Sequence, residues 1–284
     1  MTTLDEMMAH LRNRFAVAGI EDPMAEARIL VGGLLGLART DFITKGGDRL
    51  APGDEARIHD AAGRRLRGEP PYRILGRRGF HGLDLRLSKD TLEPRPDTEV
   101  LVDLMLDLLK ALRDAPLDIL DLGTGSGAIC LALLSQLPNA RGTGTDLAEG
   151  ALATAGENAA LNGLASRFRA VRSHWFDEIS GLYDVIVSNP PYIRSDVIPA
   201  LDREVREHDP LLALDGGPDG LGAYRAIAAG VRAFLKAEGI VAVETGFDQK
   251  NDVKAIFEAA GFEQIAAARD LAGNDRAQAF RRKN

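Results

Sequence analysis

The 284-residue sequence has little of what several classes of protein require. Its one cysteine, Cys130, excludes an internal disulfide and is most simply a small core residue. The five histidines, at positions 10, 59, 81, 174 and 208, lack the close His/Cys spacing of a zinc site, so no metal is expected. A formal charge of −7 leaves no basic excess for binding nucleic-acid phosphates broadly, so no stable nucleic-acid partner is expected.

Long apolar runs are also missing. No uncharged apolar segment is long enough to span a membrane, and Met1 to Glu6 do not resemble the basic start of a secretory signal. We therefore expect a cytoplasmic protein with no membrane partner. Hydrophobic residues still make up 45% of the chain, which is ample for a buried core.

Residues 1–70 are predicted to form a helical domain that docks a partner. Three stretches with apolar residues at helical spacing each follow a helix start signal. These signals are the capping-box pair Thr3 and Glu6, the pair Asp22-Pro23, and Pro52 before Asp54-Glu55. The pattern predicts at least three short helices packed as a small bundle.

Residues 71–90 are predicted to link two domains as a β-hairpin. Pro70 and Pro71 break the preceding helix, and the runs 72–75 and 83–87 alternate around Phe80-His81-Gly82. Arginine is frequent nearby, and two interpretations are open: a solvated helix face or a phosphate-contacting patch. The arginines stand at positions 57, 64, 65, 67, 73, 77 and 78.

Residues 91–284 alternate short apolar strands with helical stretches, which predicts an α/β domain with a parallel sheet covered on both faces. Strands are expected at or near 118–122, 140–145, 171, 183–188 and 240–243, and helices near 127–137, 149–161, 222–237 and 249–260. Ligands bind such sheets beyond the carboxyl ends of the strands. We therefore look for chemistry at those ends.

The first strand runs into a glycine-rich turn, Gly123-Thr124-Gly125-Ser126-Gly127. Glycine lets the backbone approach a ligand closely and adopt positive φ. The spacing differs from the G-x-G-x-x-G of dinucleotide-binding dehydrogenases, which seats a pyrophosphate. Cofactor binding, a dehydrogenase-like loop and a simple strand-to-helix turn all remain open on this feature alone.

Asp146 ends the next predicted strand, and Trp175 follows the third. An acidic side chain at Asp146 can accept hydrogen bonds from both ribose hydroxyls of an adenosine, or it can cap the helix predicted over 149–161. The Trp175 ring can pack on an adenine face or lie in the core. Both alternatives stay open for each residue.

The strand over 183–188 ends in Ser188-Asn189-Pro190-Pro191-Tyr192. Two prolines fix two φ angles, so the chain leaves the strand as a rigid turn. The carbonyls of the Asn189 side chain and the Pro190 backbone can hold both N–H bonds of a planar NH2 group in an attacking geometry, while Tyr192 stacks on it. The alternative is a purely structural strand-ending turn.

These motifs together resemble the release-factor glutamine methyltransferases, known as the PrmC or HemK family. The similarity continues through Leu92 to Glu99, Ala213 to Leu221, Glu244-Thr245-Gly246 with Gln249, and Asp270 to Arg276, so it spans nearly the whole chain. The resemblance implies a Rossmann-like class I methyltransferase domain, 91–284, behind a small N-terminal helical domain. It also implies S-adenosylmethionine as cofactor, with S-adenosylhomocysteine as product, and peptide chain release factors as the protein substrate.

The site residues that the resemblance implies fall into two groups. Asn189, Pro190, Pro191 and Tyr192 would hold the glutamine of the Gly-Gly-Gln motif, with Asn189, Pro190 and Tyr192 as the catalytic set. The cofactor contacts would be Gly123, Thr124, Gly125, Ser126, Gly127, Asp146, Trp175 and Asn189.

Two positions depart from the pattern of this family. Glu93 stands where an apolar residue is usual, and His174 stands where an aspartate is common, which puts an adenine contact from that side chain in doubt. The competing hypotheses are an amino-group methyltransferase of nucleic acid, acting on adenine, cytosine-N4 or guanine-N2, and a binding module without activity. The acidic composition disfavours the first, and the intact motifs disfavour the second.

Overall fold

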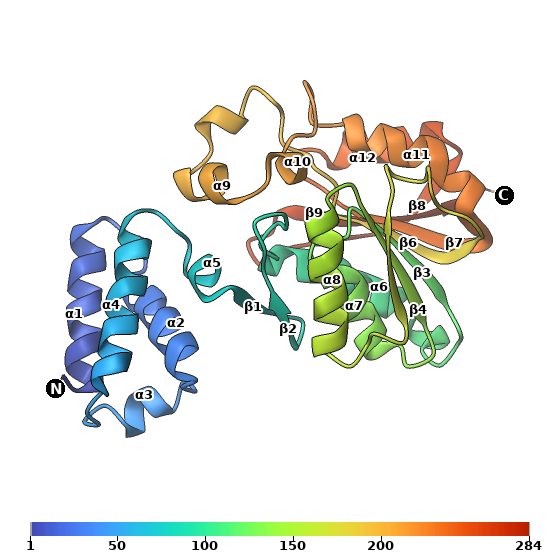
Figure 1. Ribbon diagram of the computed structural model, residues 1–284. Coiled ribbons are helices and arrows are strands. Elements are labelled where there is room, and N and C mark those ends of the chain that lie inside the picture. Colours follow the sequence, from blue (N-terminus) through green and yellow to red (C-terminus); the bar gives the residue numbers. More distant parts are fainter. Residues whose placement is uncertain (1, 284) are drawn as a thin grey trace. The chain divides into compact units, whose positions relative to one another are not determined.

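The computed structural model describes residues 2–283 and divides the chain into two compact units, Met1–Arg77 and Arg78–Asn284 (Figure 1). Each unit has a hydrophobic core of its own. Among the described residues, no helix is both long and apolar enough to cross a membrane.

The first unit is helical, as predicted. Its helices are α1 (Leu4–Val17), α2 (Pro23–Leu35), α3 (Asp41–Thr44), α4 (Pro52–Leu66) and α5 (Pro71–Leu75). The three start signals are confirmed: Thr3 and Glu6 form a capping box, Asp22 accepts from the Ala25 backbone at 3.0 Å, and Pro52 opens α4. The apolar faces of these helices, including Leu11 and Phe15, form one buried cluster.

The linker prediction needs a correction at 72–75. This segment is helical, in α5, because Pro71 sits in its first turn and Gly76, at φ +66°, ends it in the left-handed region. The hairpin itself is shorter and lies further along the chain. Its strands are β1 (Arg77–Phe80) and β2 (Leu83–Arg86), joined through His81 and Gly82.

Several of the arginines of 57–78 form ion pairs within the protein. Arg64 pairs with Glu69, and Arg65, which is only 5% exposed, pairs with Glu26. Arg57 bonds to Asp54 and to the Leu34 carbonyl. These contacts favour structural roles for the arginines over a phosphate-contacting patch.

The second unit contains a seven-stranded sheet in the order β5-β4-β3-β6-β7-β9-β8. Its strands are β3 (Asp118–Leu122), β4 (Arg141–Asp146), β5 (Phe168–Arg172), β6 (Tyr183–Ser188), β7 (Leu235–Glu244), β8 (Phe262–Arg269) and β9 (Asp275–Arg282). The first five run parallel, as predicted, whereas β9 is antiparallel to both of its neighbours. The sequence interpretation did not include β8 and β9.

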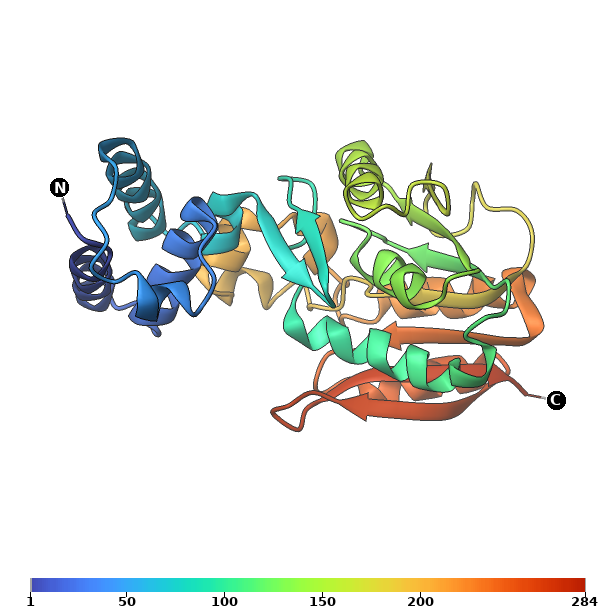
Figure 2. The same cartoon turned by 90° about the horizontal axis from the view of Figure 1, so that it is seen from below.

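Helices cover both faces of this sheet (Figure 2). Alternate residues of the central strands explain this, since Ile119 and Val185 join one core and Leu120 and Ile186 join the other. The first core contains α6 (Glu99–Leu108), α7 (Ala128–Gln136) and part of α8 (Glu149–Leu161); the second contains α11 (Gly222–Phe234) and α12 (Lys250–Ala259). The two short helices α9 (Arg203–His208) and α10 (Leu211–Leu214) lie between β6 and α11 in the sequence.

Candidate active site

A cavity of about 340 Å³ lies at the carboxyl ends of the parallel strands. It collects the ends of β3, β4 and β6, together with the segment before α6 and the α10 region. Eight predicted site residues line it, whereas Gly127, Pro190 and Tyr192 are not among its lining residues. The eight are Gly123, Thr124, Gly125, Ser126, Asp146, Trp175, Asn189 and Pro191.

The glycine-rich turn has a backbone that only glycine adopts without strain. Gly123, Gly125 and Gly127 have φ values of +70°, +54° and +83°. A Cβ on Gly127 would lie 3.0 Å from the Leu131 side chain, so this glycine also allows α7 to begin close to its neighbours. The turn therefore presents exposed backbone to the cavity on the side of Gly123 and Gly125.

Asp121, in β3, stabilises this turn through hydrogen bonds. One oxygen of its fully buried carboxylate accepts from the Thr124 hydroxyl at 2.7 Å and from the Cys130 backbone at 3.3 Å. Burial raises the pKa of Asp121 to about 7, against the lowering effect of these two donors. Among the described residues, its other oxygen is buried without a hydrogen-bond partner.

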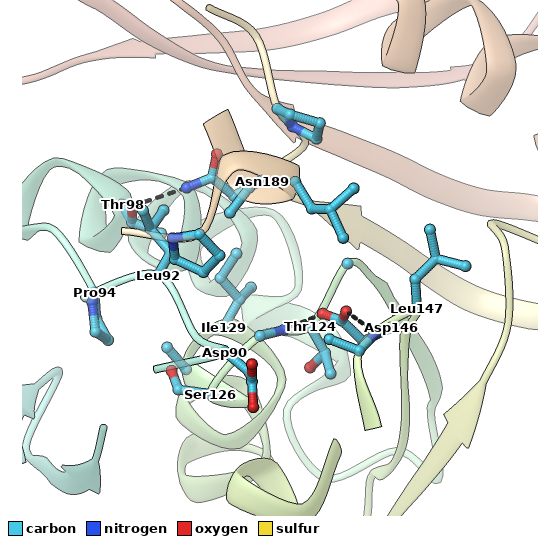
Figure 3. Close-up of a pocket in the computed structure, with 18 of the residues that line it drawn as sticks. Asp90, Leu92, Pro94, Thr98, Thr124, Ser126, Ile129, Asp146, Leu147 and Asn189 are labelled. Carbon is cyan, nitrogen blue, oxygen red and sulfur yellow. Dashed lines mark hydrogen bonds between the residues drawn. The ribbon is translucent and has the colours of Figure 1, made fainter. Parts of the chain in front are cut away.

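Asp146 faces the cavity from the end of β4 (Figure 3). Its two oxygens accept one backbone N–H each, from Gly125 at 3.0 Å and from Ala148 at 3.0 Å. Burial raises the pKa of this carboxyl group. The N-cap of α8 is Ala148, so Asp146 does not occupy the capping position that the sequence left open.

Asn189 projects from the end of β6, directly beside the end of β3, because Ser188 pairs with Leu122. Its Nδ2 donates to the Thr98 hydroxyl at 3.2 Å (Figure 3). This bond uses the NH2 end of the amide, which turns the carbonyl end away from Thr98. Thr98, in the segment Leu92 to Glu99 on which the resemblance partly rests, therefore orients Asn189.

Tyr192 turns away from the cavity lining. Its hydroxyl donates to Glu244 Oε1 at 3.3 Å, and its pKa is raised by burial and by the nearby Glu244 charge, so the hydroxyl keeps its proton. Trp175 lines the cavity and also packs at the margin of the second core. Its φ of +49° is unusual for a bulky residue.

Ile129 of α7 and Leu212 of α10 line the cavity but were missed by the sequence interpretation. Their apolar side chains carry no motif that marks them, and only the fold brings them to the cavity. Leu92, Thr98 and Ala213 also line it, and they fall in the stretches Leu92 to Glu99 and Ala213 to Leu221 on which the family resemblance rests.

Asp209, just before α10, connects this part of the chain to the segment before α6. Its carboxylate accepts from Arg95 at 2.7 Å and from the Glu93 backbone at 3.4 Å. The Asp209 side chain is only 4% exposed. Across residues 2–283, no cluster of three or more His, Cys, Asp or Glu side chains is suited to a metal ion.

Comparisons with known proteins agree with this geometry. Residues 6–76 match the model of the PrmC N-terminal domain, and residues 100–205 match that of the methyltransferase small domain. The release factor glutamine methyltransferase of Agrobacterium fabrum is 54% identical over 99% of this chain and 98% of its own. This chain belongs to that family.

Other members of the family align over similar lengths. The release factor glutamine methyltransferase of Caulobacter vibrioides is 42% identical over 96% of this chain and 94% of its own. Among solved structures, a methyltransferase from Pyrococcus furiosus superposes with a TM-score of 0.52 at 20% identity, covering 81% of this chain and 98% of that one. The similarity to the Pyrococcus furiosus structure shows only the class I methyltransferase fold, and it confirms the predicted fold class.

Family membership decides between the hypotheses that the motifs left open. The predicted resemblance is confirmed, and the dehydrogenase and inactive-module readings are set aside. The departure at Glu93 has a structural explanation, because its buried carboxylate pairs with Arg78 of β1 in place of an apolar contact. His174 lines the cavity, but its ring is largely exposed and lies near Asp177.

Proposed function

We propose that this enzyme transfers a methyl group from S-adenosylmethionine to the side-chain amide N5 of the glutamine in the Gly-Gly-Gln motif of peptide chain release factors. The single observation that carries the proposal is one cavity lined by both the glycine-rich turn and Asn189, at the ends of adjacent strands β3 and β6. One residue set suits an adenosine cofactor, and the other suits an uncharged amide.

The cofactor site suits a nucleoside without phosphates. The acidic groups Asp90, Asp146 and Asp215 line the cavity, with Arg95 the only Lys or Arg among its lining residues. Asp146 would accept the ribose hydroxyls, Trp175 would pack on the adenine, and the backbone of Gly123 to Gly127 would border the methionine part. Bound S-adenosylmethionine supplies an electrophilic methyl group, and S-adenosylhomocysteine is the product.

The amide site answers a chemical difficulty. An amide nitrogen is a poor nucleophile because its lone pair is delocalised into the carbonyl group. The Asn189 side-chain carbonyl and the Pro190 backbone carbonyl would each accept one N–H bond, which fixes the nitrogen in an attacking orientation. Pro191 lines the cavity and would support the planar group, whereas Tyr192 would hold the turn in place. No strong base is needed, because the nitrogen becomes acidic once it has formed its new bond to carbon.

The helical unit is proposed to dock the release factor. It matches the PrmC N-terminal domain model, and the cavity draws all of its lining residues from the second unit. We keep the predicted division into a docking domain, 1–70, a linker, 71–90, and a catalytic domain, 91–284, as part of this proposal. The reaction would take place in the cytoplasm, where translation terminates.

The test is methyl transfer from labelled cofactor to purified release factor. We expect label in the wild-type factor and none in a factor whose Gly-Gly-Gln glutamine is replaced by alanine. Parallel reactions with tRNA, rRNA and DNA serve as the alternative substrates. Label in nucleic acid alone, or in the alanine-substituted factor, would overturn the proposal.

A further inference from the structure

Behind the Asn189–Tyr192 turn lies a group of buried polar side chains that neither motif includes. Glu244 ends β7, the strand beside β6, and is 1% exposed. It accepts the Tyr192 hydroxyl at 3.3 Å. The side chain of Tyr192 is therefore anchored to the next strand of the sheet.

Gln249 holds the backbone of the same residue. Its Nε2 donates to the Tyr192 carbonyl at 2.9 Å and to the Gly220 carbonyl at 3.3 Å. Its Oε1 accepts from the Gly246 backbone at 3.2 Å. One side-chain amide, 8% exposed, thus joins the exit of the turn to two other loops.

The loop from Asp215 to Leu221 closes this arrangement from the other side. A Cβ on Gly220 would lie 2.4 Å from the Tyr192 carbonyl oxygen, and a Cβ on Gly216 would lie 2.8 Å from the Tyr192 Cα. Only glycine allows this approach, so the loop leaves the Tyr192 backbone little room to move. Tyr192 is consequently restrained through its hydroxyl, its carbonyl and its Cα.

We propose that Gln249 and Glu244 are positioning residues for methyl transfer, which act through Tyr192 to fix the direction of the carbonyl groups of Pro190 and Asn189. The proposal rests on the proposed function of that turn. The prolines provide the mechanical link, since fixed φ at Pro190 and Pro191 leaves mainly ψ rotations between Asn189 and Tyr192. Holding Tyr192 therefore holds the two acceptors.

The first experiment removes the donor of Gln249. Gln249→Glu keeps an acceptor for the Gly246 N–H but places a carboxylate oxygen against two carbonyls; Gln249→Leu removes all three bonds. We expect kcat for release-factor methylation to fall by about 100-fold in both variants, because a small misplacement of reacting groups has that effect.

The dissociation constant for S-adenosylmethionine, measured by calorimetry, should change less than about twofold in the same variants, because Gln249 does not line the cavity. Gln136→Leu, at an exposed glutamine on α7, is the matched control and should keep wild-type kcat.

The second experiment tests whether Glu244 acts through Tyr192. Tyr192→Phe and Glu244→Ala each break the hydrogen bond between these two residues. The kcat of the double variant should therefore equal that of the less active single variant. Glu244→Gln keeps an acceptor for the hydroxyl and should recover most of the activity lost in Glu244→Ala. This rescue distinguishes positioning from a general loss of folding.

The outcomes separate the two proposals. If the wild-type enzyme labels no release factor, the proposed function fails and the positioning proposal fails with it. If the wild type is active, Gln249 variants with kcat within about twofold of it, or with cofactor affinity reduced as much as kcat, overturn positioning alone. Additive losses in Tyr192→Phe and Glu244→Ala would likewise overturn the role of Glu244.

Discussion

At the scale of single residues, Asn189 is the side chain proposed to orient the substrate amide. Its Nδ2 is committed to Thr98, which leaves its carbonyl to accept from the substrate amide. We expect Asn189→Ala to lower kcat by about 100-fold, because it removes one of the two acceptors that orient the nitrogen. Cofactor affinity, measured by calorimetry, should fall much less.

Asn251→Ala, at an exposed asparagine on α12, is the control for this variant and should behave as wild type. Turnover of Asn189→Ala close to the wild-type value would remove Asn189 from the proposed mechanism.

Asp146 should act mainly on the cofactor. Asp146→Ala removes the proposed acceptor for the ribose hydroxyls and frees the Gly125 N–H from its partner. Hydrogen bonds to a charged group are worth about 1.5–3 kcal/mol, so we expect the dissociation constant for S-adenosylmethionine to rise by about 10- to 100-fold. Calorimetry measures this directly, with the exposed Asp107→Ala as control. An unchanged constant would leave Asp146 with only its contacts to the loop.

At the scale of elements, a buried ion pair joins the hairpin to the segment before α6. Arg78 of β1 and Glu93 have side chains that are only 14% and 7% exposed. Glu93 also donates its backbone N–H to Asp209, so the pair supports the cavity wall indirectly.

We expect Arg78→Leu to lower the free energy of unfolding by about 3–5 kcal/mol, because it leaves the Glu93 carboxylate buried without its cation. The double variant Arg78→Leu/Glu93→Leu restores an apolar residue at position 93 and should lie within about 1 kcal/mol of wild type. Urea denaturation of the set measures both values. A double variant as unstable as Arg78→Leu would show that the cost does not come from the stranded charge.

The elements also show how far sequence patterns extend. The helix starts at Thr3, Asp22 and Pro52 are local signals, and each was confirmed because the capping contacts span only a few residues. The segment 72–75 was assigned wrongly, since its short apolar run fits a strand or a helical turn equally well. Tertiary context decided for the helix.

At the scale of the whole molecule, two carboxyl groups are placed deep in the second unit. Burial raises the pKa of both Asp121 and Glu244 to about 7. Between the ordinary value of an aspartate, 3.8, and about 7, folded Asp121 keeps a proton that the unfolded chain releases. The contribution of Asp121 to the free energy of unfolding is therefore fully present below pH 3.8, the ordinary pKa of an aspartate. It is lost as the pH rises through the pKa of the folded protein, about 7.

This linkage predicts a pH-dependent difference between the wild type and Asp121→Asn, which cannot titrate. From about pH 5 to about pH 8, the wild type should lose stability relative to the variant by on the order of 3 kcal/mol. Denaturation at several pH values measures the difference, and Asp107→Asn, at an exposed site, should show none. A difference that stays constant with pH would mean that Asp121 is ionised throughout this range.

The sequence by itself determined the α/β class, the helical first unit, and the residues that meet at the ends of β3, β4 and β6. These features are encoded in periodicity, in glycine and proline placement, and in short motifs, all of which act over a few neighbouring residues. Only the tertiary structure decided that Thr98 orients Asn189, that Asp209 fastens α10, and that Gln249 and Glu244 hold Tyr192. Those contacts join residues about 50 to 115 positions apart, and no local pattern specifies which distant partner a polar side chain meets when the strands pair.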